Sequence, residues 1–221
     1  MSYSAVLFDL DGTLLDTLDD LADACNAALT IHHFPTHPVN AYRHFVGEGV
    51  PQLIAKVVPL DRRNESTMAA VAATYRVEYQ KRWNNKSKPY AGIPDMLDEL
   101  TRKKIRLAVL SNKPNDFTHQ CVQAFLPRWK FDVIRGAMPG IPRKPHPEPA
   151  LKIAKEMNLQ PADVIYLGDT NTDMQTAVAA RMYPVGVLWG FRDRAELESA
   201  GAKALIKHPT DLLKLIPTVA L

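Results

Sequence analysis

The stretch that decides the fold is residues 7–17, "LFDLDGTLLDT". Apolar residues 5–8 predict a short buried strand, and Asp9 and Asp11 follow directly after it. In an extended chain, residues i and i+2 lie on one face, so the two carboxylates point the same way. At about 5 Å and an effective dielectric constant of about 20, they repel by roughly 3 kcal/mol. The sequence therefore predicts a positive group that compensates this charge.

The bulk composition excludes several classes of protein. The chain has 221 residues, of which 46% are hydrophobic and 23% charged, with a formal net charge of +3. This is globular composition, and the charge is too small and too scattered to favour a nucleic-acid partner. No apolar run approaches the ~18 residues of a membrane span, and the early aspartates leave no room for a signal peptide. We therefore expect a cytoplasmic protein without a membrane partner, in which Cys25 and Cys121 stay reduced.

Residues 16–83 have helical periodicity and no clear strand. Apolar residues recur at helical spacing over 18–29 and 68–79, with shorter helices expected over 40–46 and 51–58. Residues 84–92, "NNKSKPYAG", resemble a polar linker. We interpret Asp16 as the N-cap of the first of these helices.

From residue 92 the pattern alternates between short β-rich runs and helices. The expected strands are 106–111, 131–134, 163–169, 184–189 and 203–206, and the expected helices are 94–103, 116–125, 148–157, 173–180 and 193–200. Such alternation predicts a parallel sheet covered on both faces. Ligands of these sheets bind beyond the carboxyl ends of the strands, which directs attention to Asp9, Ser111 and Asp169.

The residues at this edge suit a metal-bound phosphoryl group. Asp169 and Asp173, in "GDTNTD", add two carboxylates to Asp9 and Asp11, and hard oxygen ligands of this kind bind Mg²⁺. Lys144 lies in a loop with five prolines between residues 139 and 149, which restrict its backbone. Together with the Ser111 hydroxyl, Lys144 could hold a phosphoryl dianion beside the metal.

Four motifs resemble those of the haloacid dehalogenase superfamily, in the same order and spacing. They are "DLDGT" at 9–13, "LSN" at 110–112, "RKPHPEP" at 143–149 and "GDTNTD" at 168–173. The phosphoglycolate phosphatase group of that superfamily is the most similar, because "FVGEGVPQLI" at 45–54 and "GVLWGF" at 186–191 resemble its signatures. The resemblance covers essentially the whole chain.

The resemblance implies an α/β fold with a Rossmann-like parallel-sheet core and a small all-helical cap inserted after the first motif. The core would comprise residues 1–15 and 88–221, and the cap residues 16–87. It also implies a Mg²⁺-dependent phosphatase, monomeric or homodimeric, that hydrolyses a small phosphorylated metabolite through an aspartyl-phosphate. Phosphoglycolate is the first candidate substrate.

The same resemblance assigns roles to individual residues. Asp9 would be the nucleophile and Asp11 the general acid and base, with Ser111 and Lys144 completing the catalytic group. Asp9, the backbone carbonyl of Asp11, and Asp169 would bind Mg²⁺, while Asp173 either binds the ion directly or orients a metal-bound water. The residues expected to contact substrate are Asp9, Asp11, Thr13, Ser111, Asn112, Lys144 and, through a carboxylate of the substrate, Arg43.

Two alternatives and one departure remain. A phosphohexose mutase similar to β-phosphoglucomutase keeps both aspartates, and a non-catalytic binding protein could use the same fold. The dehalogenases themselves lack the second aspartate, so Asp11 favours phosphoryl transfer. The helix after "GDTNTD" usually ends in Ala-Gly in this family, whereas Arg181 stands here, so we expect a local difference at that helix end.

Overall fold

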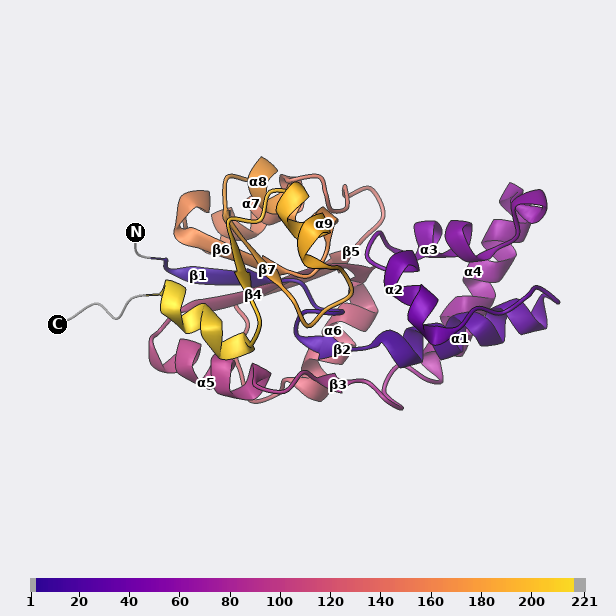
Figure 1. The fold of residues 1–221 in the computed structure, drawn as a ribbon, viewed down its shortest axis with the longest axis horizontal. Helices are drawn as coiled ribbons and strands as arrows, with labels where there is room; N and C mark the ends of the chain where they lie inside the picture. Colours follow the sequence, from indigo (N-terminus) through magenta and orange to yellow (C-terminus); the bar gives the residue numbers. More distant parts are fainter. Residues whose placement is uncertain (1–2, 217–221) are drawn as a thin grey trace. The chain divides into compact units, whose positions relative to one another are not determined.

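The computed structural model describes residues 3–216. Its centre is a six-stranded sheet with the strand order β5-β4-β1-β6-β7-β8, in which every pairing is parallel (Figure 1). The strands are β1 (Ala5–Phe8), β4 (Arg106–Pro114), β5 (Val133–Ala137), β6 (Val164–Gly168), β7 (Tyr183–Val187) and β8 (Ala204–Ile206). Each expected strand is present, so the α/β fold class is confirmed.

The helices alternate with these strands, as the sequence predicts. The α-helices are α1 (Leu18–Ile31), α2 (Tyr42–Phe45), α3 (Val50–Val57), α4 (Glu65–Gln80), α5 (Ile93–Arg102), α6 (Asn115–Phe125), α7 (Glu148–Glu156), α8 (Asn171–Ala179) and α9 (Arg194–Ser199). Short 3₁₀ helices span Val39–Ala41, Leu60–Arg62, Pro161–Asp163 and Pro209–Leu215.

The central strand β1 is buried on both faces, which explains its unbroken apolar run. On one face, α7 and α8 pack against Leu7, Leu110 and Tyr166, whereas α5 and α6 lie on the other side of the sheet (Figure 1). Each large apolar side chain buried in this way stabilises the fold by roughly 1.5–3 kcal/mol. Phe8 is in register with Val109 of β4 and with Leu167 of β6. The residues after these three strands therefore meet at one edge.

The chain divides into two compact units. The sheet unit comprises Met1–Leu15 and Pro89–Leu221, and the helical unit comprises Asp16–Lys88. Within the helical unit, α1 packs against α4 through the predicted apolar positions, which include Cys25 and Tyr75. That these units act as a catalytic core and a cap stays a prediction.

Two local details differ from the sequence expectations. The N-cap of α1 is Thr17, so the assignment of that position to Asp16 was wrong. Asp16 instead belongs to β2 (Leu15–Asp16), which pairs with β3 (Lys88–Pro89) in a two-stranded sheet. Strands of two residues are too short to produce a visible alternation, so this pairing has no signal in the sequence.

Helix α8 ends just before Arg181, where the sequence led us to expect a local difference in the helix end. Arg181 has a φ of 58°, a left-handed conformation that favours glycine. Its N–H donates to the carbonyl of Val178, and the N–H of Met182 donates to that of Ala177. These two bonds form a Schellman cap. An arginine therefore occupies the position where most such caps have glycine.

Replacing this residue should stabilise the protein slightly. Arg181→Gly removes the cost of a left-handed side-chain-bearing residue, and we expect the melting temperature to rise by about 2 °C, or about 0.5–1 kcal/mol. Gln123→Gly, at an exposed position inside α6, is the control and should lower stability by about 1 kcal/mol. Equal destabilisation by both changes in a thermal melt would contradict this account of the cap.

Candidate active site

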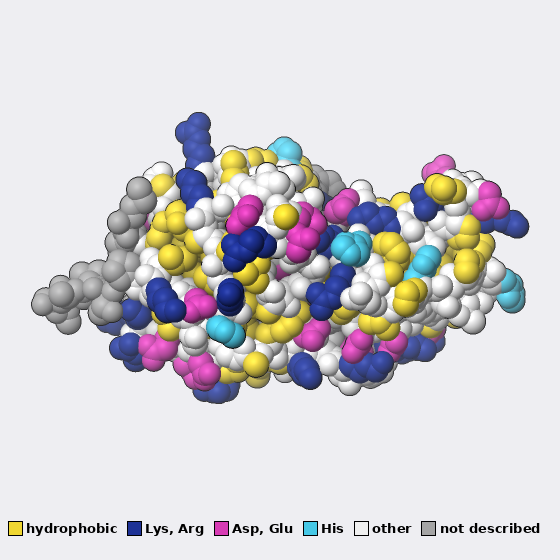
Figure 2. Space-filling model, in the orientation of Figure 1, with side chains coloured by type: hydrophobic (Ala, Val, Ile, Leu, Met, Phe, Trp, Pro, Cys, Tyr) yellow, Lys and Arg dark blue, Asp and Glu magenta, His cyan; other side chains and the backbone are white. Residues whose placement is uncertain are grey.

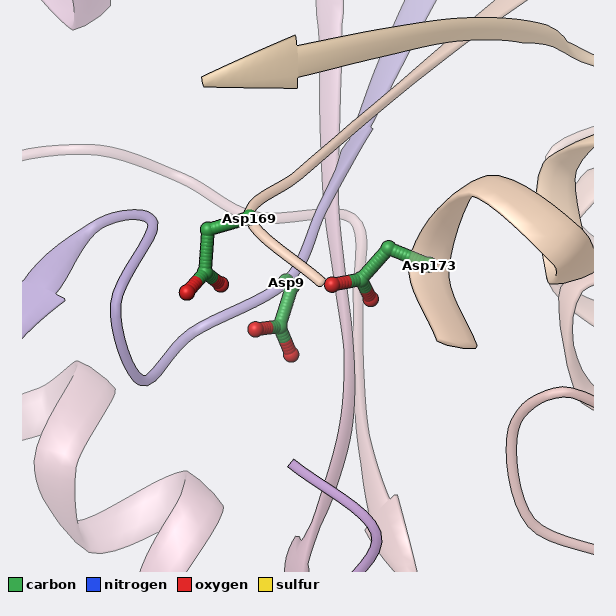
Figure 3. A group of neighbouring side chains, drawn as sticks. All are labelled: Asp9, Asp169 and Asp173. Carbon is green, nitrogen blue, oxygen red and sulfur yellow. The ribbon is translucent and has the colours of Figure 1, made fainter. Parts of the chain in front are cut away.

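Three carboxylates meet at the carboxyl edge of the sheet. Asp9 follows β1, Asp169 follows β6 and Asp173 lies in the first turn of α8. Their side chains point toward one another (Figure 3), and one oxygen from each lies within 4.8 Å of the others. All three residues are buried. The structure therefore brings together three of the four predicted metal-binding aspartates through their carboxylates.

Lys144 lies among the carboxylates of Asp9, Asp169 and Asp173, which we call the acidic group. This agrees with the placement that the proline-rich loop predicts. Lys144 Nζ lies 2.6 Å from Asp9 Oδ1 and 2.7 Å from Asp173 Oδ1, and its side chain is 2% exposed. The side chain of Asn112 fixes the lysine backbone, since its Oδ1 accepts from the Lys144 N–H at 3.0 Å and its Nδ2 donates to the Lys144 carbonyl at 3.1 Å. Asn112 thus positions Lys144, and its contact with substrate stays a prediction.

Asp169 is held by groups from two distant segments. Thr13 Oγ1 donates to its Oδ1 at 3.0 Å, and the Phe191 N–H donates to its Oδ2 at 2.8 Å. Glycines permit this approach: a Cβ on Gly12, where φ is 89°, would lie 2.3 Å from Asp169 Oδ2, and one on Gly190 would lie 2.3 Å from Asp169 Cβ. The loop after β7 therefore orients a site carboxylate through its backbone.

Asp173 is fixed by the start of α8. Its Oδ2 accepts from the N–H of Thr170 at 3.0 Å and from the Thr170 hydroxyl at 2.6 Å. Its Oδ1 faces Lys144 and accepts a longer bond, 3.4 Å, from the Tyr166 hydroxyl. Capping the helix thus leaves one oxygen of Asp173 directed into the acidic group.

Asp11 is paired with a residue that the sequence reasoning missed. Lys113 Nζ lies 2.8 Å from Asp11 Oδ1 and 2.9 Å from Asp11 Oδ2. Ser111 is buried near the end of β4, and its hydroxyl accepts the Lys113 N–H at 3.2 Å. A usable signal did exist, because Ser111 and Lys113 repeat on β4 the i, i+2 spacing of the two aspartates after β1.

Arg43 is the one predicted site residue that lies outside the sheet unit. It lies in α2 of the helical unit, where it is half-buried. Its contact with substrate stays a prediction.

Burial shifts the proton affinities of the acidic group. It raises the pKa of Asp9 well above the usual value; Lys144 opposes this shift, and the charges of Asp173 and Asp169 add to it. Burial, with Asp173, raises the pKa of Asp169 to about 7. For Lys144, burial lowers the pKa, but the charges of Asp173 and Asp9 outweigh it and keep the ammonium form. These shifts mean that one lysine does not compensate three buried carboxylates.

The donor set fits a divalent cation. Three buried carboxylates and one ammonium leave two excess negative charges when all are ionised, and the ligand atoms are hard oxygens of the kind that Mg²⁺ prefers. Asp9, Asp169 and, as the family resemblance implies, the backbone carbonyl of Asp11 would hold the ion, with Asp173 either binding it directly or orienting a metal-bound water.

Magnesium affinity should therefore depend on pH. The raised pKa of Asp169 means that the folded, metal-free protein keeps a proton that the unfolded chain releases near pH 4, so its stability should fall as the pH rises from about 4 to about 7. Mg²⁺ binds the ionised form, so its affinity should increase with pH, by about tenfold per pH unit for each displaced proton.

Titration calorimetry at pH 5.5 and pH 8, together with thermal melts in Mg²⁺ or EDTA, would measure both effects. Asp169→Asn should reduce the pH dependence of Mg²⁺ affinity by the share that comes from this carboxyl group, whereas Asp98→Asn, on the surface of α5, should leave it unchanged. An affinity independent of pH in the unaltered protein would count against these three carboxylates as the metal site.

The fold and this site define an α/β protein with a buried acidic centre at the carboxyl edge of its sheet. A family model described as haloacid dehalogenase-like hydrolase matches residues 6–187, and the chain belongs to that family. The expectation of a phosphatase-like enzyme of this family is thereby confirmed.

Individual relatives agree over almost the full length. The chain is 30% identical to a phosphoglycolate phosphatase of Haemophilus influenzae, over 86% of this chain and 87% of that protein. It is 28% identical to an N-acetylmuramic acid 6-phosphate phosphatase of Pseudomonas putida, over 98% and 97%. A crystal structure from Lactobacillus delbrueckii, described as a "putative phosphoglycolate phosphatase", has 29% identity and a TM-score of 0.91, covering 98% and 99%.

Two surface observations bear on partners. Among the described residues, no helix combines the length and the apolar character that crossing a membrane requires. On the face drawn in Figure 2, Lys and Arg side chains are interspersed with Asp and Glu rather than gathered into one stripe.

Proposed function

We propose that the chain is a Mg²⁺-dependent phosphatase that hydrolyses a small phosphorylated metabolite through an aspartyl-phosphate on Asp9. The observation that carries the proposal is the contact of Lys144 with both Asp9 and Asp173 inside the acidic group. A carboxylate between an ammonium group and a cation site is placed to receive a phosphoryl dianion, because both positive groups balance the charge that collects there.

In the first step, an oxygen of Asp9 attacks phosphorus as the ester bond breaks. The bond's electron pair passes to the leaving oxygen, which takes a proton from Asp11. In the second step Asp11 removes a proton from water, whose oxygen attacks phosphorus and frees Asp9. Ser111 and Lys144 hold the phosphoryl oxygens throughout. When bound, Mg²⁺ would neutralise charge on the phosphoryl group and on the aspartates that hold it.

Phosphoglycolate is the first candidate substrate, since several relatives similar over most of the chain bear that name. The test is phosphate release with Mg²⁺ from a panel that includes phosphoglycolate, N-acetylmuramic acid 6-phosphate and a hexose phosphate. Release from phosphoglycolate at the highest kcat/KM supports the proposal. Formation of an isomerised sugar phosphate without phosphate release would identify the mutase instead.

Arg43→Ala tests recognition of the substrate's carboxylate. Loss of a charge-assisted hydrogen bond is worth about 1.5–3 kcal/mol, so KM for phosphoglycolate should rise by about 10–100-fold. Hydrolysis of p-nitrophenyl phosphate should be nearly unchanged. The control is Arg62→Ala, an exposed arginine of the same unit, which should affect neither. A uniform loss over all substrates would indicate a structural role for Arg43.

We also propose that the protein is cytoplasmic and that it is a monomer or a homodimer. In the part of the chain that the structure describes, Cys25 and Cys121 form no disulfide, which supports a reducing compartment.

A further inference from the structure

Lys113 is a buried lysine to which the steps above assign no role. Its side chain is 3% exposed, and it faces both oxygens of Asp11, whose side chain is 17% exposed. Most other ion pairs of the described residues are far more exposed, as between Arg102 and Glu99. A buried lysine is rarely kept without a specific partner, so this contact needs an explanation.

The backbone of β4 directs Lys113 toward Asp11. Between Leu110 and Pro114, β4 advances four residues while its partner β5 advances two, from Arg135 to Ala137. Such an irregularity re-aims side chains and commonly lies beside active sites.

Further contacts hold this segment of β4. The Thr118 hydroxyl donates a hydrogen bond to the Lys113 carbonyl at 3.2 Å. The backbone of Gly136 lies close to the same oxygen, because a Cβ on Gly136 would be 2.6 Å from it. The backbone of Lys113 is thus hydrogen-bonded to α6 on one side and passes close to β5 on the other.

The site consequently contains two carboxylate–lysine pairs from neighbouring segments. Lys144 contacts Asp9, and Lys113 contacts Asp11. Asp11 lies two residues from Asp9, and repulsion from the acidic group would drive its side chain toward water. Two hydrogen bonds from one ammonium group oppose that movement and restrict the rotation of the carboxyl group.

We propose that Lys113 is a positioning residue that holds the Asp11 carboxyl group in the direction from which it transfers protons. The inference rests on the proposed function, in which Asp11 protonates the leaving oxygen and then takes a proton from water. Lys113 keeps its own protons in both steps and only donates hydrogen bonds. Proton transfer requires close alignment, and a displacement of about 1 Å can cost about 10²-fold in rate.

The test is a double-mutant cycle of Lys113→Met and Asp11→Asn, read on phosphoglycolate and p-nitrophenyl phosphate with Mg²⁺. Lys113→Met should lower kcat on phosphoglycolate by about 10²-fold at nearly constant KM, and lower it less on the nitrophenyl ester, whose leaving group needs little protonation. In the Asp11→Asn background the same change should cost less than about threefold, because no proton remains to be positioned. Lys113→Arg should recover part of the lost kcat.

Several results would overturn the inference. Losses that multiply in the double variant would show that Lys113 acts independently of Asp11. A higher KM for phosphoglycolate at unchanged kcat would make Lys113 a substrate-binding residue. Lys152→Met, which removes a surface lysine of α7, is the control for loss of charge.

Thermal melts separate folding defects from catalytic ones. If Lys113→Met fails to fold, Lys113→Arg carries the comparison and should lower kcat without raising KM; no loss of kcat in that variant would overturn the inference. If the unaltered protein hydrolyses neither ester, the proposed function fails and the inference fails with it. If the unaltered protein hydrolyses the esters but the losses of the two single variants multiply in the double variant, the inference about Lys113 is refuted and the proposed function stands.

Discussion

Asp9→Asn is expected to abolish turnover, with a loss of roughly 10⁴-fold or more. The amide that replaces the carboxylate does not attack phosphorus and is a weak ligand for Mg²⁺. It also has nearly the same shape as the carboxylate, so it removes one buried charge without opening a cavity. Phosphate release under saturating substrate measures the loss, and a thermal melt checks that the variant is folded.

The matched control for Asp9→Asn is Asp98→Asn, an exposed aspartate beside Arg128 and Trp129. It should retain full activity. A folded Asp9→Asn variant that keeps more than about one per cent of kcat would rule out Asp9 as the nucleophile.

Asp11→Asn should lower turnover on alkyl phosphates by about 10²–10⁴-fold, the usual contribution of general acid–base catalysis. The variant keeps the backbone carbonyl proposed as a metal ligand, so Mg²⁺ binding should survive. Its amide oxygen can still accept a hydrogen bond from Lys113, so the local structure should be retained. The side chain no longer supplies or removes a proton, and this is the property that the measurement isolates.

The leaving group decides how that result is interpreted. p-Nitrophenolate departs with little protonation, so Asp11→Asn should reduce its release much less than release of an alkyl alcohol. Because Asp11 also serves the second step, which both esters share, the comparison is made on release of the alcohol in the first turnover. Equal losses there would argue that Asp11 gives no proton to the leaving oxygen. Calorimetry with Mg²⁺ on the same variant would separate a metal defect from a proton defect.

The sheet and its functional edge could be predicted because both depend on local sequence. Buried parallel strands require unbroken apolar runs, such as that before Asp9, and the residue that follows such a run lies at the carboxyl edge. Asp9, Ser111 and Asp169 each follow one. Asp173 could be expected there too, because it belongs to the first turn of the helix that begins after β6.

The contacts that orient these groups could not be predicted in the same way. The bond from Phe191 to Asp169 comes from a backbone N–H, which every residue except proline possesses, and it joins positions 22 residues apart. Asn112 faces the Lys144 backbone across 32 residues for similar reasons. Lys113 was missed because the expected strand ended at Ser111, whereas β4 continues to Pro114. The contact of Lys113 with Asp11 depends on this continuation of β4 beyond Ser111.

The central claim is the covalent intermediate on Asp9, and trapping it tests the account most directly. The enzyme would be mixed with phosphoglycolate and Mg²⁺, quenched within one turnover and treated with borohydride, which reduces an acyl phosphate to the alcohol. Tandem mass spectrometry of the peptide that contains residues 5–17 then locates the reduced residue. The account predicts homoserine at position 9 and unmodified aspartate at positions 11 and 16. Reduction at another aspartate, or none during active turnover, would contradict it.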